Sequence, residues 1–300
     1  MKVKRQKIEN DFTKGLIVNG QLTQLLRILS ENGDPQRGRH FFHRGGNPEL
    51  LNMSRPNKFL KRKIWYRSEK TMFPYIGSAD GLEEKFPNLT ERNGIAKLIP
   101  FNTSDQDGET DIELSQTYKA NKKISHPKKK GQKQSLEFGY DLEKIIGLEQ
   151  DMVDIVFKLT NTNDFEIKYQ FGWQGTFNSL GYSKEGWFNI NYIDESKKEI
   201  TDRPKLRDIP LILPIYRERK RKRKKLYENL VNLSYDNKST GRRIEIGTNF
   251  PHLQMWRPYR NIFTLEFVTS VKSGIKAFGK QVQKLGPQET KEYIINLRLI

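Results

Sequence analysis

The stretch FPHLQMWRPYRNIFTLEFVTS, residues 250–270, is the part around which the rest of the chain is organised. Its second half alternates with period two, so one side of a strand carries Phe263, Leu265 and Phe267 and the other carries Ile262, Thr264, Glu266 and Val268. A carboxylate within an apolar strand costs free energy unless it is paired or has a chemical task. Glu266 is therefore a candidate site residue. The alternative is a glutamate on the solvated face of an antiparallel sheet.

A second alternating region lies in the middle of the chain. Residues 152–159 place four apolar side chains on one face, namely Val153, Ile155, Phe157 and Leu159. Residues 160–164, TNTND, have the composition of a turn, and residues 165–171 alternate again. This order predicts a β-hairpin with one buried and one solvated face.

Further strands are expected at residues 187–193, 226–233, 243–246, 253–256 and 293–299. Asn19-Gly20 between two apolar runs predicts a hairpin, although the apolar spacing after it also fits a short helix. One helix is expected around residues 141–150. Many short strands separated by turn signals predict an all-β sandwich or barrel, and the lack of a 20–50-residue period argues against a solenoid or propeller. No break in composition divides the chain, so we expect one domain, with residues 1–15 as a peripheral segment.

The amino-acid composition excludes several classes of protein and of site. A chain of 300 residues can bury a large core, and no apolar run approaches the roughly 20 residues of a membrane helix. The charged N-terminus does not resemble a secretory signal, and the absence of cysteine excludes disulfides and thiolate chemistry. We therefore expect a cytoplasmic protein that needs no cofactor. His40 and His43 could face one ligand, but few carboxylates lie nearby, so no metal site is predicted.

The charge of the chain is strongly positive, at +18. One dense run supplies Arg217, Arg219, Lys220, Arg221, Lys222, Arg223, Lys224 and Lys225, and a smaller cluster lies at residues 122–133. Such a run is typical of a patch that binds nucleic acid or another polyanion, or of a solvated loop. No zinc finger, RNP-like sequence or clear helix-turn-helix accompanies it.

Five segments in order resemble the aldose 1-epimerase, or galactose mutarotase-like, superfamily, in particular its shorter bacterial branch. They are residues 66–77 (YRSEKTMFPYIG), 89–97 (LTERNGIAK), 159–180 (LTNTNDFEIKYQFGWQGTFNSL), 250–270, and 285–289 (LGPQE) before the last strand. The resemblance covers most of residues 60–300. It implies a large antiparallel β-supersandwich over residues 1–300, with a sugar site on its concave face, which agrees with the strand pattern.

The resemblance also implies a chemistry. In the family a glutamate takes the proton of the anomeric hydroxyl and a histidine protonates the ring oxygen, so that the ring opens and closes again on either face. The glutamate matches Glu266. The acid histidine, however, falls on Gln174, the second histidine on Asn93, and an arginine on Lys97. Glutamine can donate a hydrogen bond but has no proton to transfer near neutral pH.

Other residues are candidates for contacts to the sugar. Trp173, with Trp187 and Trp256 as further options, could offer an aromatic face, or each could belong to the core. Asn178 lies in the same motif as Gln174. Arg67 could contact the sugar or a phosphate, or form an ordinary surface ion pair, and His252 is a candidate substitute acid.

Three functions follow, in this order. The first is a sugar-binding, epimerase-like protein with weak or no mutarotase activity. The second is an active epimerase on an anionic sugar, phosphorylated or uronic, whose charge Lys97, Arg67 and the basic run would neutralise. The third is a binder of nucleic acid or of an acidic partner through the basic run. No membrane partner is expected, and the sequence does not indicate an oligomeric state.

Overall fold

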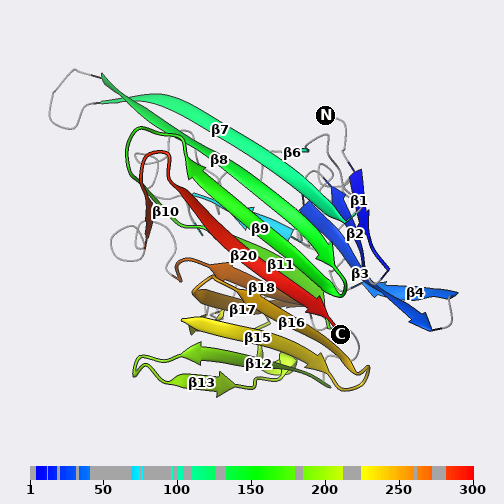
Figure 1. Ribbon diagram of the computed structural model, residues 1–300. Helices are drawn as coiled ribbons and strands as arrows, with labels where there is room; N and C mark the ends of the chain where they lie inside the picture. The colour runs from blue at the N-terminus through cyan, green and yellow to red at the C-terminus, as the bar shows by residue number, and fades with distance from the viewer. Residues whose placement is uncertain are drawn as a thin grey trace, which may run out of the picture.

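The structure, a computed structural model, describes residues 5–11, 13–18, 21–31, 34–40, 69–74, 76, 96, 101–103, 110–125, 133–179, 185–211, 224–259, 262–271 and 282–300. All strand pairs among these residues are antiparallel, and they form two large and two small sheets (Figure 1). The predicted all-β sandwich is therefore confirmed.

The largest sheet has nine strands. In spatial order they are β13 (Glu199–Asp202), β12 (Gly186–Ile193), β15 (Leu230–Asn237), β16 (Arg242–Thr248), β20 (Thr290–Leu299), β9 (Met152–Asn161), β8 (Lys133–Glu149), β7 (Asp111–Ser125) and β6 (Asn102–Thr103). A short 3-10 helix, η3 (Leu206–Asp208), follows β13.

The second large sheet has five strands and carries the residues of interest. Their order is β14 (Lys225–Glu228), β17 (His252–Tyr259), β18 (Ile262–Val268), β11 (Gly172–Asn178) and β5 (Glu69–Met72). The smaller sheets are β1 (Arg5–Glu9), β2 (Thr13–Val18), β3 (Gln21–Glu31) and β4 (Asp34–His40), and the pair β10 (Ile167–Tyr169) and β19 (Gln283–Leu285).

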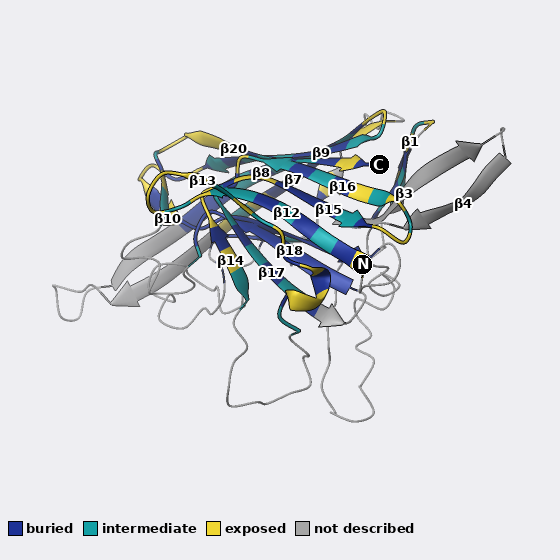
Figure 2. Ribbon diagram, turned by 90° about the horizontal axis from the view of Figure 1, so that it is seen from below, coloured by how far each residue is buried: buried dark blue, intermediate teal, exposed yellow. Residues whose placement is uncertain are grey.

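The core lies between the two large sheets, which Figure 2 shows as stacked layers with β14, β17 and β18 below β12 and β15. Alternation along each strand directs every second side chain inward. In β9 these are the four predicted apolar residues, all with no exposed surface. In β18 they include Leu265 and Phe267, which are equally buried. Glu266 therefore lies on the face of the five-stranded sheet that is turned away from this core.

The predicted hairpin of residues 152–171 is wrong. β9 pairs with β8 and β20, whereas β10 pairs with β19 in a separate sheet. The turn between β9 and β10 does form, but the Asn161 amide donates to the carbonyls of Phe165, Leu285 and Gly286 and so ties it to the β19 region. Alternation correctly gave the inward side chains of β9 and those of Ile167, Tyr169 and Phe171, but Phe165 is exposed and Gln170 is buried. It carries no information about the partner strand.

Two other sequence predictions are settled by the structure. The expected helix around residues 141–150 is wrong, because these residues continue β8, with Leu142, Lys144 and Ile146 pointing into the core. The expected hairpin around Asn19-Gly20 is confirmed, since β2 and β3 pair antiparallel on either side of it.

The predicted strand at residues 226–233 is two strands in different sheets. Asn229, with φ of +51°, separates β14 in the five-stranded sheet from β15 in the nine-stranded sheet. Asparagine tolerates this left-handed conformation better than most residues, so it allows the chain to change layers there. Among the described residues no helix has the length and apolar character needed to cross a membrane.

Candidate functional site

A row of polar side chains crosses the five-stranded sheet on the face away from the core. In register order it runs Lys70 on β5, Gln174 on β11, Glu266 on β18 and Gln254 on β17. Directly opposed residues in antiparallel strands lie about 4.5–5.5 Å apart at their Cβ atoms. Gln174 and Glu266, which were singled out from sequence, are therefore immediate neighbours with their side chains on the same face.

The row continues along the strands with further polar groups. Thr176 lies opposite Thr264, with their hydroxyl oxygens 3.3 Å apart, and Asn178 ends β11 on the same face. Gln174 and Glu266 are nearly buried, with exposures of 8% and 3%. A polar row at this depth is costly unless its groups are hydrogen-bonded or have a ligand to bind.

Glu266 is held by two partners. Lys224 forms an ion pair with its Oε2, and the Trp256 indole N–H donates to its Oε1 at 3.2 Å. Burial alone would raise the pKa of Glu266, but the charges of Lys224 and Lys70 and the two hydrogen bonds outweigh it and hold the pKa below its usual value. The carboxylate is therefore well stabilised as an anion, and a stabilised anion is a weaker proton acceptor.

Trp256 is the aromatic residue that the structure brings to this site. It is half-buried on β17 opposite Thr264, and the Lys224 Nζ lies 5.8 Å from the centre of its ring. Trp187, the other option considered from sequence, lies instead on β12 of the nine-stranded sheet, under Lys238.

Trp173 is on the opposite face from Gln174 and is completely buried. Its indole N–H donates to Glu69 Oε1 at 2.7 Å, and its ring lies over Gly175, where a Cβ would meet the ring at 2.4 Å. Because neighbouring residues in a strand face opposite ways, Trp173 and Gln174 cannot share a ligand. The predicted stacking of Trp173 on a sugar is thus inconsistent with its place in the core.

His252, the candidate substitute acid, lies on the same face as Glu266, two residue pairs along the β17–β18 ladder. Its Nδ1 is buried and has no hydrogen-bond partner among the described residues. Burial lowers the pKa of His252, while Glu228 on β14 opposes this effect in part. A lowered pKa leaves the ring neutral near pH 7, which weighs against a role as proton donor.

The last two residues of the basic run both have carboxylate partners, and Lys224 belongs to this site. Besides the Lys224–Glu266 pair, Lys225 binds Asp202 at 3.0 Å and lies over the Tyr227 ring at 5.4 Å. Asp202 in turn accepts from the Tyr227 hydroxyl at 2.6 Å. The other six predicted patch residues, Arg217, Arg219, Lys220, Arg221, Lys222 and Arg223, lie outside the described residues.

Three further predicted residues, Arg67, Asn93 and Lys97, also lie outside the described residues. Ala96, between the last two, is described: its N–H donates to the Phe73 carbonyl at 3.3 Å, and its carbonyl accepts from Gln116. In the part of the chain that the structure describes, no group of three or more histidine, aspartate or glutamate side chains could hold a metal ion.

Sequence reasoning missed Lys70, Lys224 as a partner of Glu266, and Gln254. Gln254 and Trp256 alternate with Leu253 and Met255, so their shared face could have been inferred. Lys224 and Glu266 are 42 positions apart in the sequence. Their pairing depends on the register of β14 against β17, for which the sequence gives no local signal.

Comparisons with known proteins bear on the fold. Neither protein-family models nor curated proteins give a match to the chain. Among solved structures, it is similar to a galactose mutarotase-like protein from Lactobacillus casei ATCC 334, with a TM-score of 0.65, 14% identity, and coverage of 99% of this chain and 100% of that one. It is also similar to a galactose mutarotase related enzyme from Lactobacillus acidophilus, with a TM-score of 0.64 and 13% identity. That match covers 99% of this chain and 97% of the other.

A putative aldose 1-epimerase from Escherichia coli K12 is similar over 100% of this chain and 99% of its own, with a TM-score of 0.63 and 11% identity. At such low identity the likeness extends to the fold, over essentially the whole length of both chains. The chain therefore has the fold of the galactose mutarotase-like and aldose 1-epimerase-like proteins.

Proposed function

We propose that this protein binds a sugar on the polar row of the five-stranded sheet and has little or no mutarotase activity. The observation that carries the proposal is the direct pairing of Gln174 with Glu266, in a fold shared with aldose 1-epimerase-like proteins. A carboxylate and two amides on one face offer acceptors and donors to the hydroxyls of a sugar.

The proposed loss of catalysis rests on proton transfer. Ring opening needs a base at the anomeric hydroxyl and an acid at the ring oxygen, and each typically contributes about 10²–10⁴-fold to the rate. Gln174 cannot supply a proton, and Lys224 and Lys70 lower the pKa of Glu266. Glu266 then acts as a hydrogen-bond acceptor, since a carboxylate has about four acceptor positions and two are occupied here.

The test compares binding with catalysis in the same samples. Binding of glucose and galactose is measured by calorimetry and anomer exchange by NMR, for the wild type, Glu266→Gln and the control Glu292→Gln, an exposed glutamate on β20. We expect millimolar binding that weakens about tenfold in Glu266→Gln only, and exchange no faster than in buffer. Exchange well above buffer that Glu266→Gln abolishes would show an enzyme, and no binding of either hexose would refute the sugar site.

A second candidate is a site for an anionic sugar. Lys70 and Lys224 both act on Glu266 and outnumber it, so the polar row carries a net positive charge among its described residues. Such a site would prefer glucose 6-phosphate or glucuronate to glucose. Calorimetry with these three ligands at two salt concentrations decides the matter: tighter, salt-dependent binding of the anions supports this candidate, and equal binding excludes it.

A further inference from the structure

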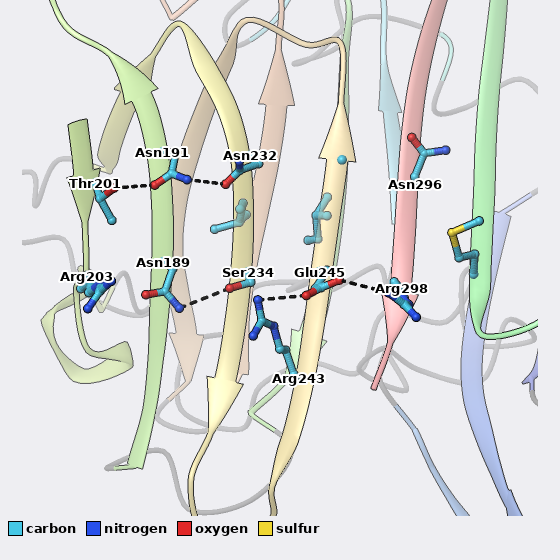
Figure 3. Close-up of a pocket in the computed structure, with 14 residues that line it drawn as sticks. Asn189, Asn191, Thr201, Arg203, Asn232, Ser234, Arg243, Glu245, Asn296 and Arg298 are labelled. Atoms are coloured by element: carbon cyan, nitrogen blue, oxygen red, sulfur yellow. Dashed lines mark hydrogen bonds and ion pairs between the residues drawn. The ribbon is translucent and has the colours of Figure 1, made fainter. Parts of the chain in front are cut away.

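The described residues form a hollow on the opposite side of the molecule from Glu266. It lies on the face of the nine-stranded sheet away from the core, has a volume of about 760 Å³, and receives side chains from β12, β13, β15, β16, β20 and β9 (Figure 3). This volume falls within the range of small-molecule sites. We call it the outer trough. It shares no residue with the Glu266 site.

A chain of hydrogen bonds orients the amides on one side of the outer trough. The Thr201 hydroxyl donates to Asn191 Oδ1 at 2.8 Å, and Asn191 Nδ2 donates to Asn232 Oδ1 at 2.9 Å (Figure 3). The Asn232 Nδ2 itself donates to no described residue. Its N–H groups are thus held in place and available to an acceptor in the trough.

The other side of the trough presents the complementary group. Asn296 on β20 donates through Nδ2 to Asp154 Oδ1 at 2.6 Å, and its Oδ1 accepts from no other described residue. A fixed donor on β15 therefore stands across β16 from a fixed acceptor on β20. A hydroxyl group is both a donor and an acceptor, so this arrangement suits a ligand with several hydroxyls.

Gly247 lies between these two amides. It pairs with Asn296, and it stands beside Asn232, one position beyond the last β15–β16 pair of Leu233 and Ile246. A Cβ at Gly247 would make only ordinary contacts, at 3.5 Å from Asn296 Oδ1, and its φ is not in the left-handed region. Neither packing nor backbone geometry requires glycine at this position. Glycine also destabilises a strand, so its presence there needs another explanation. Its effect is to leave the floor of the trough open.

Three arginines and one glutamate line the trough: Arg243 and Arg298 are paired with carboxylates, whereas Arg203 forms no ion pair with a described residue. Arg243 binds Glu245 at 2.9 Å, as Figure 3 shows, and it also approaches Asp236. Arg298 binds Asp151 at 3.1 Å. Arginines already paired with carboxylates have little attraction left for a polyanion. With two of its three arginines neutralised, the trough favours a neutral ligand over a polyanion.

From these features we propose that the outer trough binds a neutral glycan segment through Asn232 and Asn296, with Gly247 as the floor. The ligand class follows from the donor–acceptor pair, the open glycine and the pairing of two of the three arginines with carboxylates. This proposal does not depend on the function of the Glu266 site.

The test uses maltotetraose and cellotetraose as neutral probes and a heparin tetrasaccharide as the anionic one. Binding is measured by calorimetry in the Glu266→Gln protein, so that the first site, weakened about tenfold, contributes little. The key variant is Gly247→Val. The matched control is Gly147→Val on β8, on the same face but outside the trough, where an added Cβ meets nothing within 4 Å. Thermal unfolding checks that both variants fold, as valine in a strand should allow.

We expect millimolar binding of at least one neutral probe, unchanged in Gly147→Val and weakened at least tenfold in Gly247→Val. Asn232→Asp keeps the acceptor for Asn191 but removes the donors, and should weaken binding by about 3- to 10-fold. Equal binding by Gly247→Val and Gly147→Val would overturn the proposal. So would binding of the heparin probe alone, or of no probe.

Discussion

The two faces of the five-stranded sheet each carry a glutamate bound by a lysine and a tryptophan, and the two clusters differ in their surroundings. On the core side, Glu69 Oε1 accepts from Lys144 and from Trp173, at 2.5 and 2.7 Å. On the far side, Glu266 is bound by Lys224 and Trp256. We call these the core cluster and the open cluster.

The core cluster is fully enclosed. The side chains of Glu69 and Lys144 have no exposed surface, and Lys144 extends from β8 across the core to β5. Its Nζ lies within 6 Å of the ring centres of Phe101 and Phe157, and the Leu22 N–H donates to Glu69 Oε2. The cluster thus joins β3, β5, β8 and β11, which belong to three sheets.

The open cluster joins neighbouring strands of one sheet, and its lysine side chain is 31% exposed. A ligand can compete with a partner that water already reaches, but not with one sealed in the core. The same three residue types are thus sealed in the core on one face and partly reached by solvent on the other. Exposure of the lysine, and not the composition of the cluster, makes this difference.

Removing the lysine of the core cluster should have the largest effect. Lys144→Met leaves Glu69 buried without its charge partner, and breaking such a pair typically costs about 3–5 kcal/mol. Urea unfolding followed by tryptophan fluorescence measures the free energy of unfolding. A loss below about 1 kcal/mol would show that the core cluster does not matter for stability.

The double variant Lys144→Met/Glu69→Gln should recover part of that loss, about 1–3 kcal/mol. Glutamine removes the unpaired charge but keeps an acceptor for the Trp173 and Leu22 N–H groups. The same urea experiment, completed with Glu69→Gln alone, gives the coupling between the two residues. Additive losses would mean that the lysine and the glutamate act independently.

The sequence predicted strands and their inward faces, but not which strands pair to form each sheet. Alternation placed Phe263, Leu265 and Phe267 in the core and Glu266 on the other face, because the two-residue period of a strand is a local property. It did not reveal that β9 pairs with β8, directly before it, and with the distant β20, while β10 pairs with the distant β19. At residues 141–150 the buried Lys144 disguised a strand, since a lysine pointing inward is unusual unless it is paired.

In the candidate site, too, some features could be predicted from the sequence and others could not. Gln174 beside Glu266 followed from family resemblance, whereas Lys224, Lys70 and the burial of Trp173 depend on strand register. The basic run was interpreted as a polyanion-binding patch or a solvated loop, yet Lys224 and Lys225 are paired with Glu266 and Asp202. Charge density in the sequence does not reveal which charges have partners in the fold.

Removing the lysine of the open cluster should have a smaller effect on stability. Lys224→Met is expected to cost about 1–2 kcal/mol, because Glu266 keeps the Trp256 hydrogen bond and the nearby Lys70, and the lysine is partly solvated. The pKa of Glu266 should rise, as its largest favourable charge interaction is lost. Urea unfolding gives the stability, and carboxyl NMR titration gives the pKa. A stability loss equal to that of Lys144→Met would erase the distinction between the two clusters.

The smallest effect is expected at His252, beside the open cluster. Its pKa is lowered in the folded protein, and its unfolded value is about 6.5. Between these two values the unfolded chain binds more protons, so the free energy of unfolding should rise with pH in this window and level off above it. In His252→Asn this part of the rise should disappear, while His40, His43 and His126 remain the same in both proteins. Urea midpoints at pH 5, 6, 7 and 8 measure the difference, and parallel curves would show that His252 titrates alike in both states.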